Sequence, residues 1–437
     1  MAHLIAGLKR LGLADLLLRR HPLYYPRARR ELEAFDRLDG EARRHWQQRK
    51  LRRLLVAAGR CDYGRQLGSP AFLGDWPILE KEAVRERPEA FLTGAGGITA
   101  PASTSGTTGT PLSLRRSLAS VAFEQAVLDG LIARAGFEPA RCRGAVLRGD
   151  DVKDPADRKP PFWRRANSGR RLIFSSNHLD GETLGAFVEA LRGYAPQVLF
   201  AYPTVLESLC ALMLERGITL SIPLTVCGSE VLTRETCELA RRALATRIVS
   251  YYGQAERVAF AAGNSEDGYR FLPSYGVVEL RFVESDGGTD VYDVIGTGLW
   301  NLAMPLVRYA TGDRVRLRAG GSVAAVEEGR ETFLDILGRS GDYILAPSGA
   351  RLLGIDHIPR DVPHVVRAQF VQESAEAVTL LIVPAPGFNE ECRQLLLEHA
   401  RLKLPPSMTL QIQTTDRLVR NRAGKAPLVI RHADGTA

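Results

Sequence analysis

Apolar residues recur at two spacings along the chain, and each spacing predicts a different element. Three short apolar runs end at Pro or Gly and predict buried strands: residues 198–202, 224–227 and 248–252. Helical periodicity fills the intervals, with Thr204 and Thr233 as expected N-caps. Strands that alternate with helices predict an α/β fold with a largely parallel sheet. Its ligands belong at the C-terminal ends of the strands.

The flanking segments follow other patterns. Residues 1 to about 100 predict helices and loops, with 24–26 as a break and 32–59 as a helical segment, and 118–135 predicts another helix. A strand is expected at 144–149, and the polar, Pro-rich stretch 150–171 is expected to leave the core. Alternating residues from 277 to 318 predict antiparallel strands, and the tail predicts a small α+β domain. The expected organisation is a large domain at 1–340 and a small one at 343–437, joined by a hinge.

Composition limits the classes of protein. The chain has 437 residues, of which 45% are hydrophobic, and a formal charge of +8 that comes from scattered arginines. This charge favours a solvated basic surface that attracts anionic substrates, so nucleic acid is not an expected partner. Six cysteines without Cys-x-x-Cys spacing indicate neither a disulfide framework nor a zinc site, and a cytoplasmic location is expected. The apolar stretches at the N-terminus are too short for a membrane span.

The stretch 102–111, Ala-Ser-Thr-Ser-Gly-Thr-Thr-Gly-Thr-Pro, holds six hydroxyl side chains and two glycines. Glycine lets backbone N–H groups approach phosphate oxygens, and hydroxyls add short donors. Such a loop suits a polyphosphate, although a flexible linker has the same composition. It is not a Walker loop, because no Gly-Lys followed by Ser or Thr ends it.

Four further polar stretches follow, at 228–230, 252–256, 308–313 and 338–342, and Lys425 stands near the end. Each alone is typical of a turn or a solvated surface. In their order and spacing they resemble the adenylate-forming superfamily, and within it the phenylacetate–CoA ligase and CapK-type branch. The residues that carry the resemblance are 103–111, 201–204, 227–230, 251–256 and 305–313, and it covers the chain from about residue 70 onward.

The resemblance implies ATP and Mg²⁺ as cofactors. The phosphates would be held by Thr104, Ser105, Gly106, Thr107, Thr108 and Gly109, and the adenosine by Gly228, Ser229, Glu230, Tyr251, Tyr252, Gly253 and Gln254. Glu256 would be a catalytic residue and the Mg²⁺ ligand, and Asp313 would accept from both ribose hydroxyls. Arg339 would contact the ribose or the α-phosphate, and Lys425 would stabilise charge in the transition state. His178 is a candidate beside the substrate carboxylate, but a surface histidine before a helix is the preferred interpretation.

The implied reaction joins a carboxylic acid to AMP with release of pyrophosphate, then transfers the acyl group to a thiol. Tyr202, Tyr251, Phe260 and Tyr275 would border the acid and favour an aromatic one, although aromatic residues at strand ends are also ordinary core. CoA, the phosphopantetheine arm of an acyl carrier protein, and an amine all stay open as acceptors, and so does a homodimer.

Two departures from the family pattern stand out. Leu112 replaces a lysine after the loop, leaving Arg115 or Arg116 to supply that charge, and Gly341 replaces an aspartate at the hinge. The rival hypotheses are an amide-forming or AMP-transferring enzyme, and a catalytically silent binding protein on the same fold.

Overall fold

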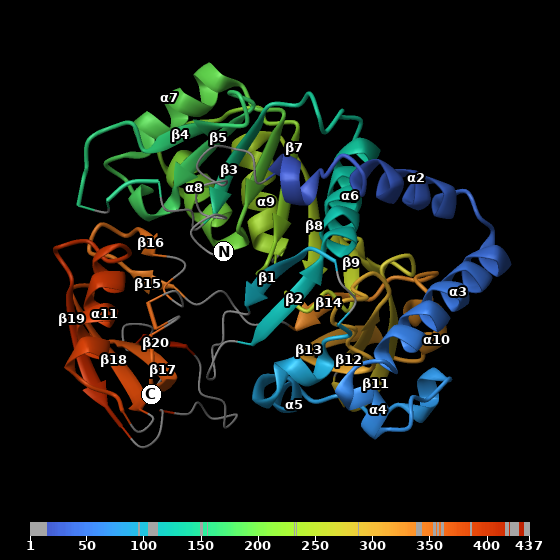
Figure 1. Ribbon diagram of the computed structural model, residues 1–437. Coiled ribbons are helices and arrows are strands. Elements are labelled where there is room, and N and C mark those ends of the chain that lie inside the picture. The colour runs from blue at the N-terminus through green and yellow to red at the C-terminus, as the bar shows by residue number, and fades with distance from the viewer. Residues whose placement is uncertain are drawn as a thin grey trace. The chain divides into compact units, whose positions relative to one another are not determined.

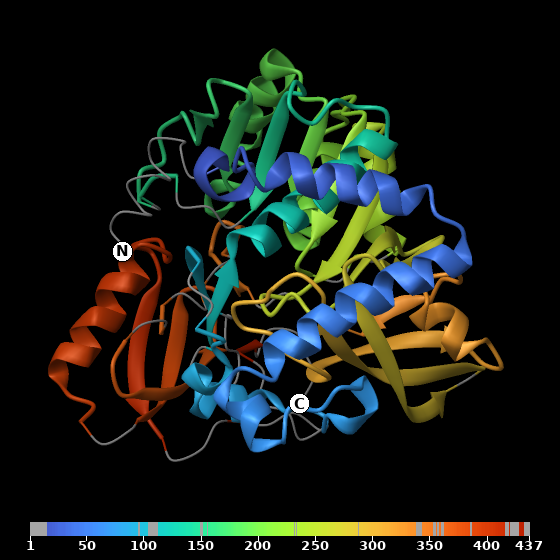
Figure 2. The same cartoon turned by 45° about the vertical axis from the view of Figure 1, so that its right-hand side comes forward.

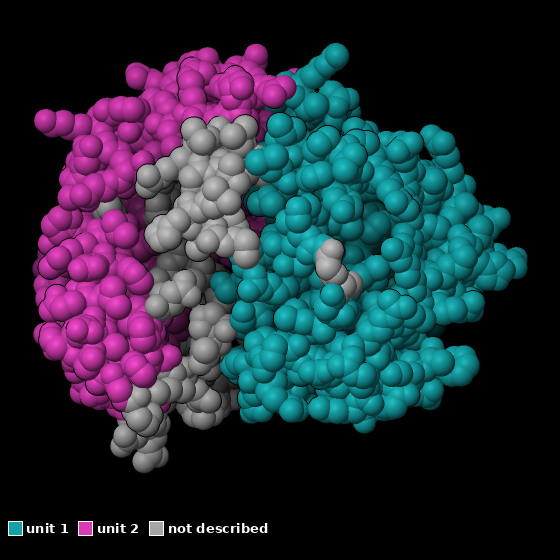
Figure 3. All heavy atoms as spheres, viewed as in Figure 1, with its two compact units in different colours: residues 1–104, 112–142, 249–338 teal, residues 105–111, 143–248, 339–437 magenta. Residues whose placement is uncertain are grey.

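The computed structural model describes residues 15–94, 97–103, 112–148, 152–154, 156–230, 232, 234–286, 288–337, 343–352, 355, 358–359, 362–384, 387–415, 419 and 428–431. The chain divides into two compact units (Figure 3). Unit 1 comprises residues 1–104, 112–142 and 249–338, and unit 2 comprises 105–111, 143–248 and 339–437. None of the helices in these described stretches is long and apolar enough to cross a membrane.

Helix α2 (Tyr25–Asp36) of unit 1 is amphipathic and packs beside α6 (Leu118–Arg134). In α2, Ala28, Leu32 and Phe35 are buried, a spacing that places them on one face. Pro26 lies in the first turn of α2, and the break expected at 24–26 separates α2 from the helical turn Asp15–Arg19. In both Figure 1 and Figure 2, α2 runs beside α6, and the two helices are in contact. The α-helices of this unit are α2 (Tyr25–Asp36), α3 (Gly40–Ala58), α4 (Asp62–Gln66), α5 (Lys81–Glu86), α6 (Leu118–Arg134) and α10 (Val323–Glu327).

The strands of unit 1 form antiparallel arrangements. A hairpin pairs β1 (Thr99–Ser103) with β2 (Ser113–Ser117), and its register sets Ser103 opposite Ser113. A four-stranded sheet has the order β11 (Gly276–Asp286), β12 (Thr289–Gly298), β13 (Tyr309–Arg318), β14 (Asp335–Leu337). This sheet confirms the antiparallel strands expected at 277–318. The third set runs β10 (Gly268–Phe271), β9 (Phe260–Asn264), β8 (Arg247–Gly253).

Unit 2 contains the parallel strands. Their order is β7 (Leu224–Gly228), β6 (Val198–Ala201), β3 (Gly144–Arg148), β5 (Arg171–Ser175), β4 (Trp163–Ala166). The pairs β7/β6, β6/β3 and β3/β5 are parallel, which confirms the α/β prediction. The stretch expected to leave the core contributes β4, which pairs antiparallel with β5.

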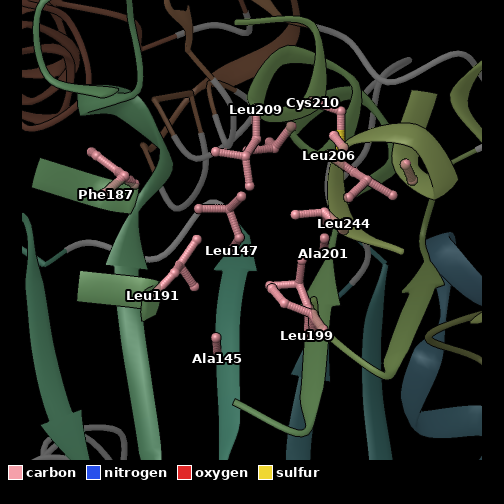
Figure 4. Close-up of a cluster of buried hydrophobic side chains, with 14 of the residues drawn as sticks. Ala145, Leu147, Phe187, Leu191, Leu199, Ala201, Leu206, Leu209, Cys210 and Leu244 are labelled. Carbon is pink, nitrogen blue, oxygen red and sulfur yellow. The ribbon is translucent and has the colours of Figure 1, made fainter. Parts of the chain in front are cut away.

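Helices α7 (Leu184–Tyr194), α8 (Pro203–Glu215) and α9 (Arg234–Leu244) pack against one face of these strands. Leu147, Leu199 and Ala201 from the strands meet side chains of these helices (Figure 4). Helix α8 begins at Pro203 with Tyr202 as its N-cap, so the expected cap at Thr204 is wrong. Proline favours the first helical position because it has no N–H to leave unpaired there.

The C-terminal part of unit 2 has its own sheet and core. The sheet has the order β19 (Thr409–Thr414), β18 (Ala377–Pro384), β17 (Val365–Gln372), β20 (Val429–Arg431). Helix α11 (Glu390–Arg401) shares its core, in which Phe370, Leu380 and Leu396 are fully buried. A two-stranded ribbon precedes it, made of β15 (Ile344–Leu345) and β16 (Arg351–Leu352). The α+β tail expected from the sequence is therefore present.

Candidate active site

Tyr252 and Asp313, which are 61 residues apart in the chain, form a hydrogen-bonded pair in unit 1. The Tyr252 hydroxyl donates to Oδ2 of Asp313 at 2.8 Å, and Nε2 of Gln254 donates to the same hydroxyl at 2.5 Å. Burial, and then the charge of Asp313, raises the pKa of Tyr252 well above its ordinary value. The phenol therefore stays protonated and keeps donating. Three of the residues predicted to hold adenosine are thus brought together.

Glu256 lies in the same unit and is 8% exposed. Its Oε1 atom accepts a hydrogen bond from the Tyr309 hydroxyl at 2.8 Å and lies 3.7 Å from Nζ of Lys81. Burial and the charge of Glu256 raise the pKa of Tyr309, so this hydroxyl also remains a donor. Sequence reasoning gave neither partner a role. Tyr309 lies within the polar stretch 308–313, whereas Lys81 lies outside every stretch that carries the family resemblance.

The backbone beside Glu256 is held by an arginine. Nε and Nη2 of Arg116 both donate to the carbonyl oxygen of Ala255, at 2.9 and 2.5 Å. Burial, and then the nearby charge of Arg257, lowers the pKa of Arg116 to about 10, which leaves the side chain protonated at neutral pH. The guanidinium that was a candidate to replace the missing lysine is engaged with the main chain.

Arg257 adopts a left-handed backbone conformation, with φ of 58°, which is uncommon for a residue other than glycine. Its Nε lies 2.6 Å from Oε2 of Glu124 on α6, and Tyr275 donates to that oxygen at 2.8 Å. The main chain at residues 257 and 258 lies close to two glycines, where there is no room for a Cβ atom. A Cβ at Gly298 would lie 2.3 Å from the Arg257 carbonyl oxygen, and one at Gly276 would lie 2.3 Å from that of Val258.

In unit 2, Gly228 ends β7, and Ser229 and Glu230 follow it at the edge of the sheet where α/β folds bind their ligands. Gly228 is buried, whereas Ser229 is exposed and has φ of 71°. A left-handed serine at a strand end is a strained feature of the kind that clusters at binding sites. The local geometry is compatible with a ligand-contacting turn.

His178 is fully buried, so the preferred interpretation as a surface residue is wrong. Its Nδ1 lies 2.7 Å from Oγ of Ser175, its Nε2 lies 3.2 Å from the Asp154 carbonyl oxygen, and the Phe162 ring stacks on it. Burial lowers the pKa of His178, which favours the neutral imidazole. Both ring nitrogens of His178 have protein partners, as expected of a histidine that stabilises the packing of unit 2.

Two of the aromatic residues expected to border the acid are core residues. Phe260 is 1% exposed and Tyr275 is 3% exposed, and both pack with Phe123 in the core beneath α2 and α6. Tyr251 stacks on Phe260 with ring centroids 5.5 Å apart and is partly buried. Of the four aromatic residues expected to border the acid, Tyr202 and Tyr251 stay candidates.

Several predicted site residues lie outside the described residues: the loop from Thr104 to Gly109, Arg339, Gly341 and Lys425. Within the part of the chain that is described, no group of three or more His, Cys, Asp or Glu side chains could hold a metal ion. Glu256 as a Mg²⁺ ligand stays a prediction, of the kind in which a single carboxylate binds the ion together with substrate phosphates. The two contacts given above both involve Oε1 of Glu256.

Comparisons with known proteins bear on the family. A model of the CapK C-terminal domain family matches residues 348–432. Protein CapK of Staphylococcus aureus is 23% identical over 321 residues, which are 72% of this chain and 70% of that protein. The crystal structure of a 2-hydroxyisobutyryl-CoA ligase, in complex with 2-HIB-AMP and CoA, superposes with a TM-score of 0.51 at 16% identity. That match covers 90% of this chain and 91% of the ligase, and it indicates a shared fold. Residues 348–432 therefore match the CapK C-terminal domain family, the chain is similar to Protein CapK over 72% of its length, and its fold is that of the 2-hydroxyisobutyryl-CoA ligase.

Proposed function

We propose that this protein is an ATP-dependent ligase that converts a carboxylic acid to an acyl-adenylate and passes the acyl group to a thiol. The observation that carries the proposal is the convergence of the motif residues in unit 1. Tyr252 is bonded to Asp313, and Glu256 lies beside Tyr309 and Lys81. These are a hydroxyl-binding carboxylate, an aromatic ring and a cation-binding carboxylate, which are the groups that a nucleotide requires.

The described contacts suggest how the nucleotide would be positioned. Asp313 would accept from the ribose hydroxyls while the Tyr252 hydroxyl fixes its carboxylate, and the Tyr252 ring would lie against adenine. Gln254 bonds both to Tyr252 and, through Oε1, to the N–H of Ala259 at 3.3 Å, so it ties the ring to the main chain that follows. Groups that the protein's own hydrogen bonds hold in position lose less conformational freedom when a ligand binds, which lowers the cost of binding.

Glu256 would hold Mg²⁺, which offsets the charge of the phosphates as pyrophosphate leaves. Tyr309 and Arg116 keep this carboxylate and its backbone in place. The loop from Thr104 to Gly109 would surround the β- and γ-phosphates. Lys425 would bind the incoming carboxylate, and Arg339 would contact the ribose or α-phosphate. These last roles follow from the family resemblance.

The class of the acid and the identity of the acceptor are more specific proposals. The proposal that the acid is aromatic rests on Tyr202 and Tyr251, because Phe260 and Tyr275 pack in the core. A structurally similar ligase is described in complex with CoA, which favours CoA or a phosphopantetheine arm as the thiol here.

The test is acid-dependent release of pyrophosphate from ATP and Mg²⁺, measured with aryl, arylacetic and fatty acids. Wild type should respond to one class of acid, Lys425→Ala should lose the response, and the matched control Lys159→Ala, an exposed lysine of unit 2, should keep it. Adding CoA or an amine then identifies the acceptor by which one is consumed. Absence of release by wild type across the whole panel would contradict the proposal and favour a silent binding protein.

A further inference from the structure

Arg257 holds a guanidinium group inside unit 1 whose hydrogen bonds are not satisfied. Its side chain is 10% exposed, and its Nη1 atom is buried without a hydrogen-bond partner among the residues that the structure describes. Its Nε atom lies 2.6 Å from Oε2 of Glu124 but is not aligned for a hydrogen bond. A buried charged donor without a partner is unfavourable. A ligand that accepts hydrogen bonds would satisfy this group.

Arg20 shows how a structural arginine is satisfied on the same helix. It also pairs with a carboxylate of α6, and its Nε and Nη2 donate to the two carboxylate oxygens of Asp129, at 3.1 and 2.8 Å. Its Nη1 donates to Asp15 at 2.5 Å. Each of the three guanidinium nitrogens of Arg20 therefore has a partner. Arg257 departs from this pattern, so anchoring α6 does not explain it.

The charged groups around Arg257 leave one positive charge in excess. The guanidinium of Arg116 is close enough to be repelled by that of Arg257, and its own hydrogen bonds go to an uncharged main-chain carbonyl oxygen. Glu124 is the carboxylate that these two arginines share. Glu256, the other carboxylate that acts on Arg116, already accepts a hydrogen bond from Tyr309. An anion bound at Arg257 would balance the excess.

The surroundings of this charge favour an organic anion. Arg257 directly follows Glu256, and its φ of 58° is a strained conformation of the kind that clusters at binding sites. The Tyr275 hydroxyl donates to Glu124, while the Tyr275 ring packs with Phe123 in an aromatic core. A carboxylate on an apolar body matches a charged nitrogen beside such rings better than a hydrated triphosphate does. The Glu124 side chain is 24% exposed, so the cluster meets solvent at that carboxylate.

We propose that Arg257 binds a carboxylate group of the acid substrate through Nη1, and that Glu124 holds the guanidinium until the acid arrives. The inference rests on the proposed function. When the acid binds, the misaligned pair with Glu124 gives way to a hydrogen-bonded one, and the excess charge is neutralised. Two carboxylates have this chemistry: the reacting group itself, or the second acidic group of a dicarboxylic acid. In either case Arg257 is a specificity residue for the acid.

The experiment measures pyrophosphate release by the full chain with pairs of acids that differ by one carboxylate. The pairs are benzoate and terephthalate, phenylacetate and 1,4-phenylenediacetate, and octanoate and suberate. Arg257→Gln should raise KM for the acid by about 10- to 100-fold, the range for a hydrogen bond to a charged group, and leave KM for ATP unchanged. Glu124→Gln should lower KM for the acid, because the competing carboxylate is gone. A rise for both members of a pair identifies the reacting carboxylate, and a rise for the dicarboxylic acid alone identifies the second one.

The matched control is Arg20→Gln, which removes another ion pair with α6. Arg20 is 21% exposed and its partner Asp129 is 2% exposed, so this change should lower the melting temperature while both KM values match wild type. If Arg257→Gln fails to fold, as judged by thermal melting, Arg257→Gly takes its place. Glycine adopts a positive φ without strain, so this variant keeps the backbone and loses only the side chain.

An unchanged KM for every acid in Arg257→Gln would overturn this inference and leave the proposed function intact. Equal rises in KM for the acid and for ATP would also overturn it, since they would mark Arg257 as a structural residue. A wild type that releases no pyrophosphate with any acid would instead overturn the proposed function itself. A rise for the acid alone in Arg257→Gln, together with a fall in Glu124→Gln, supports the inference.

Discussion

Tyr309→Phe removes a single oxygen atom, the one that donates to Glu256. The tyrosine is fully buried and the bond is 2.8 Å long, so water does not replace the lost donor. A hydrogen bond to a charged group contributes about 1.5–3 kcal/mol to stability. Lys81 remains 3.7 Å from the same oxygen and offsets part of the loss, which places the expected decrease near the lower end, at about 1.5–2 kcal/mol.

Loss of this hydrogen bond should also lower the catalytic rate, because the Glu256 carboxylate is no longer held in one rotamer. A tenfold change in kcat/KM corresponds to about 1.4 kcal/mol, so kcat/KM for ATP should fall about tenfold or slightly more. Urea unfolding followed by tryptophan fluorescence measures the first effect, and pyrophosphate release measures the second. The denaturant dependence of the unfolding free energy should not change.

A matched control is Tyr194→Phe in unit 2. Its hydroxyl donates to the uncharged carbonyl oxygen of Gly169 at 3.0 Å, so its loss should lower stability by about 0.5–1.5 kcal/mol. Pyrophosphate release should stay at the wild-type rate. If Tyr309→Phe is no less stable than wild type, the hydrogen bond to Glu256 contributes nothing to the free energy of unfolding. If it loses stability but keeps full activity, Tyr309 does not position a catalytic carboxylate.

Three further predictions concern other buried groups. Arg116→Lys keeps the charge but loses the two-atom donation to the Ala255 carbonyl oxygen, so kcat/KM for ATP should fall about tenfold, by pyrophosphate release. Burial lowers the pKa of His178 below its ordinary 6.5, so its contribution to stability is full above that pH and is lost as the pH falls below it; His178→Gln should flatten this part of an unfolding-versus-pH series. Burial, and then Glu124, raises the pKa of Tyr275 well above 10, so stability should decline as the pH rises above 10, and less so in Tyr275→Phe.

The elements that the sequence predicts well are those whose signals are local. The strand ending before Pro203 and the helix beginning at Leu118 are defined by apolar spacing and by neighbouring Pro, Gly or Ser residues, and both are found within a residue or so of the prediction. Tyr252, Glu256 and Asp313 stand in short, ordered patterns that predict them as site residues. The structure pairs Tyr252 with Asp313 and buries Glu256, and their roles in binding stay a prediction.

Other features depend on contacts between distant segments. His178 is buried by Phe162 and Asp154, which come from the polar, Pro-rich stretch whose composition indicates a loop. Lys81 and Glu256 are 175 residues apart, by subtraction, and no periodic pattern links them. Phe260 and Tyr275 are aromatic residues near strand ends, and the sequence does not say whether such a residue packs against a ligand or a helix.

The close approach of Gly276 and Gly298 to residues 257 and 258 has a consequence for how this protein tolerates sequence change. A saturation library should show these two hairpin positions to be as intolerant as the site itself, even to alanine, because a methyl group would push on the main chain one or two residues beyond Glu256. Sequence change in the β11–β12 hairpin is therefore restricted at the end that holds Gly276 and Gly298. At Gly288, in the turn, a Cβ would meet nothing within 4 Å, so side chains compatible with its positive φ have open space.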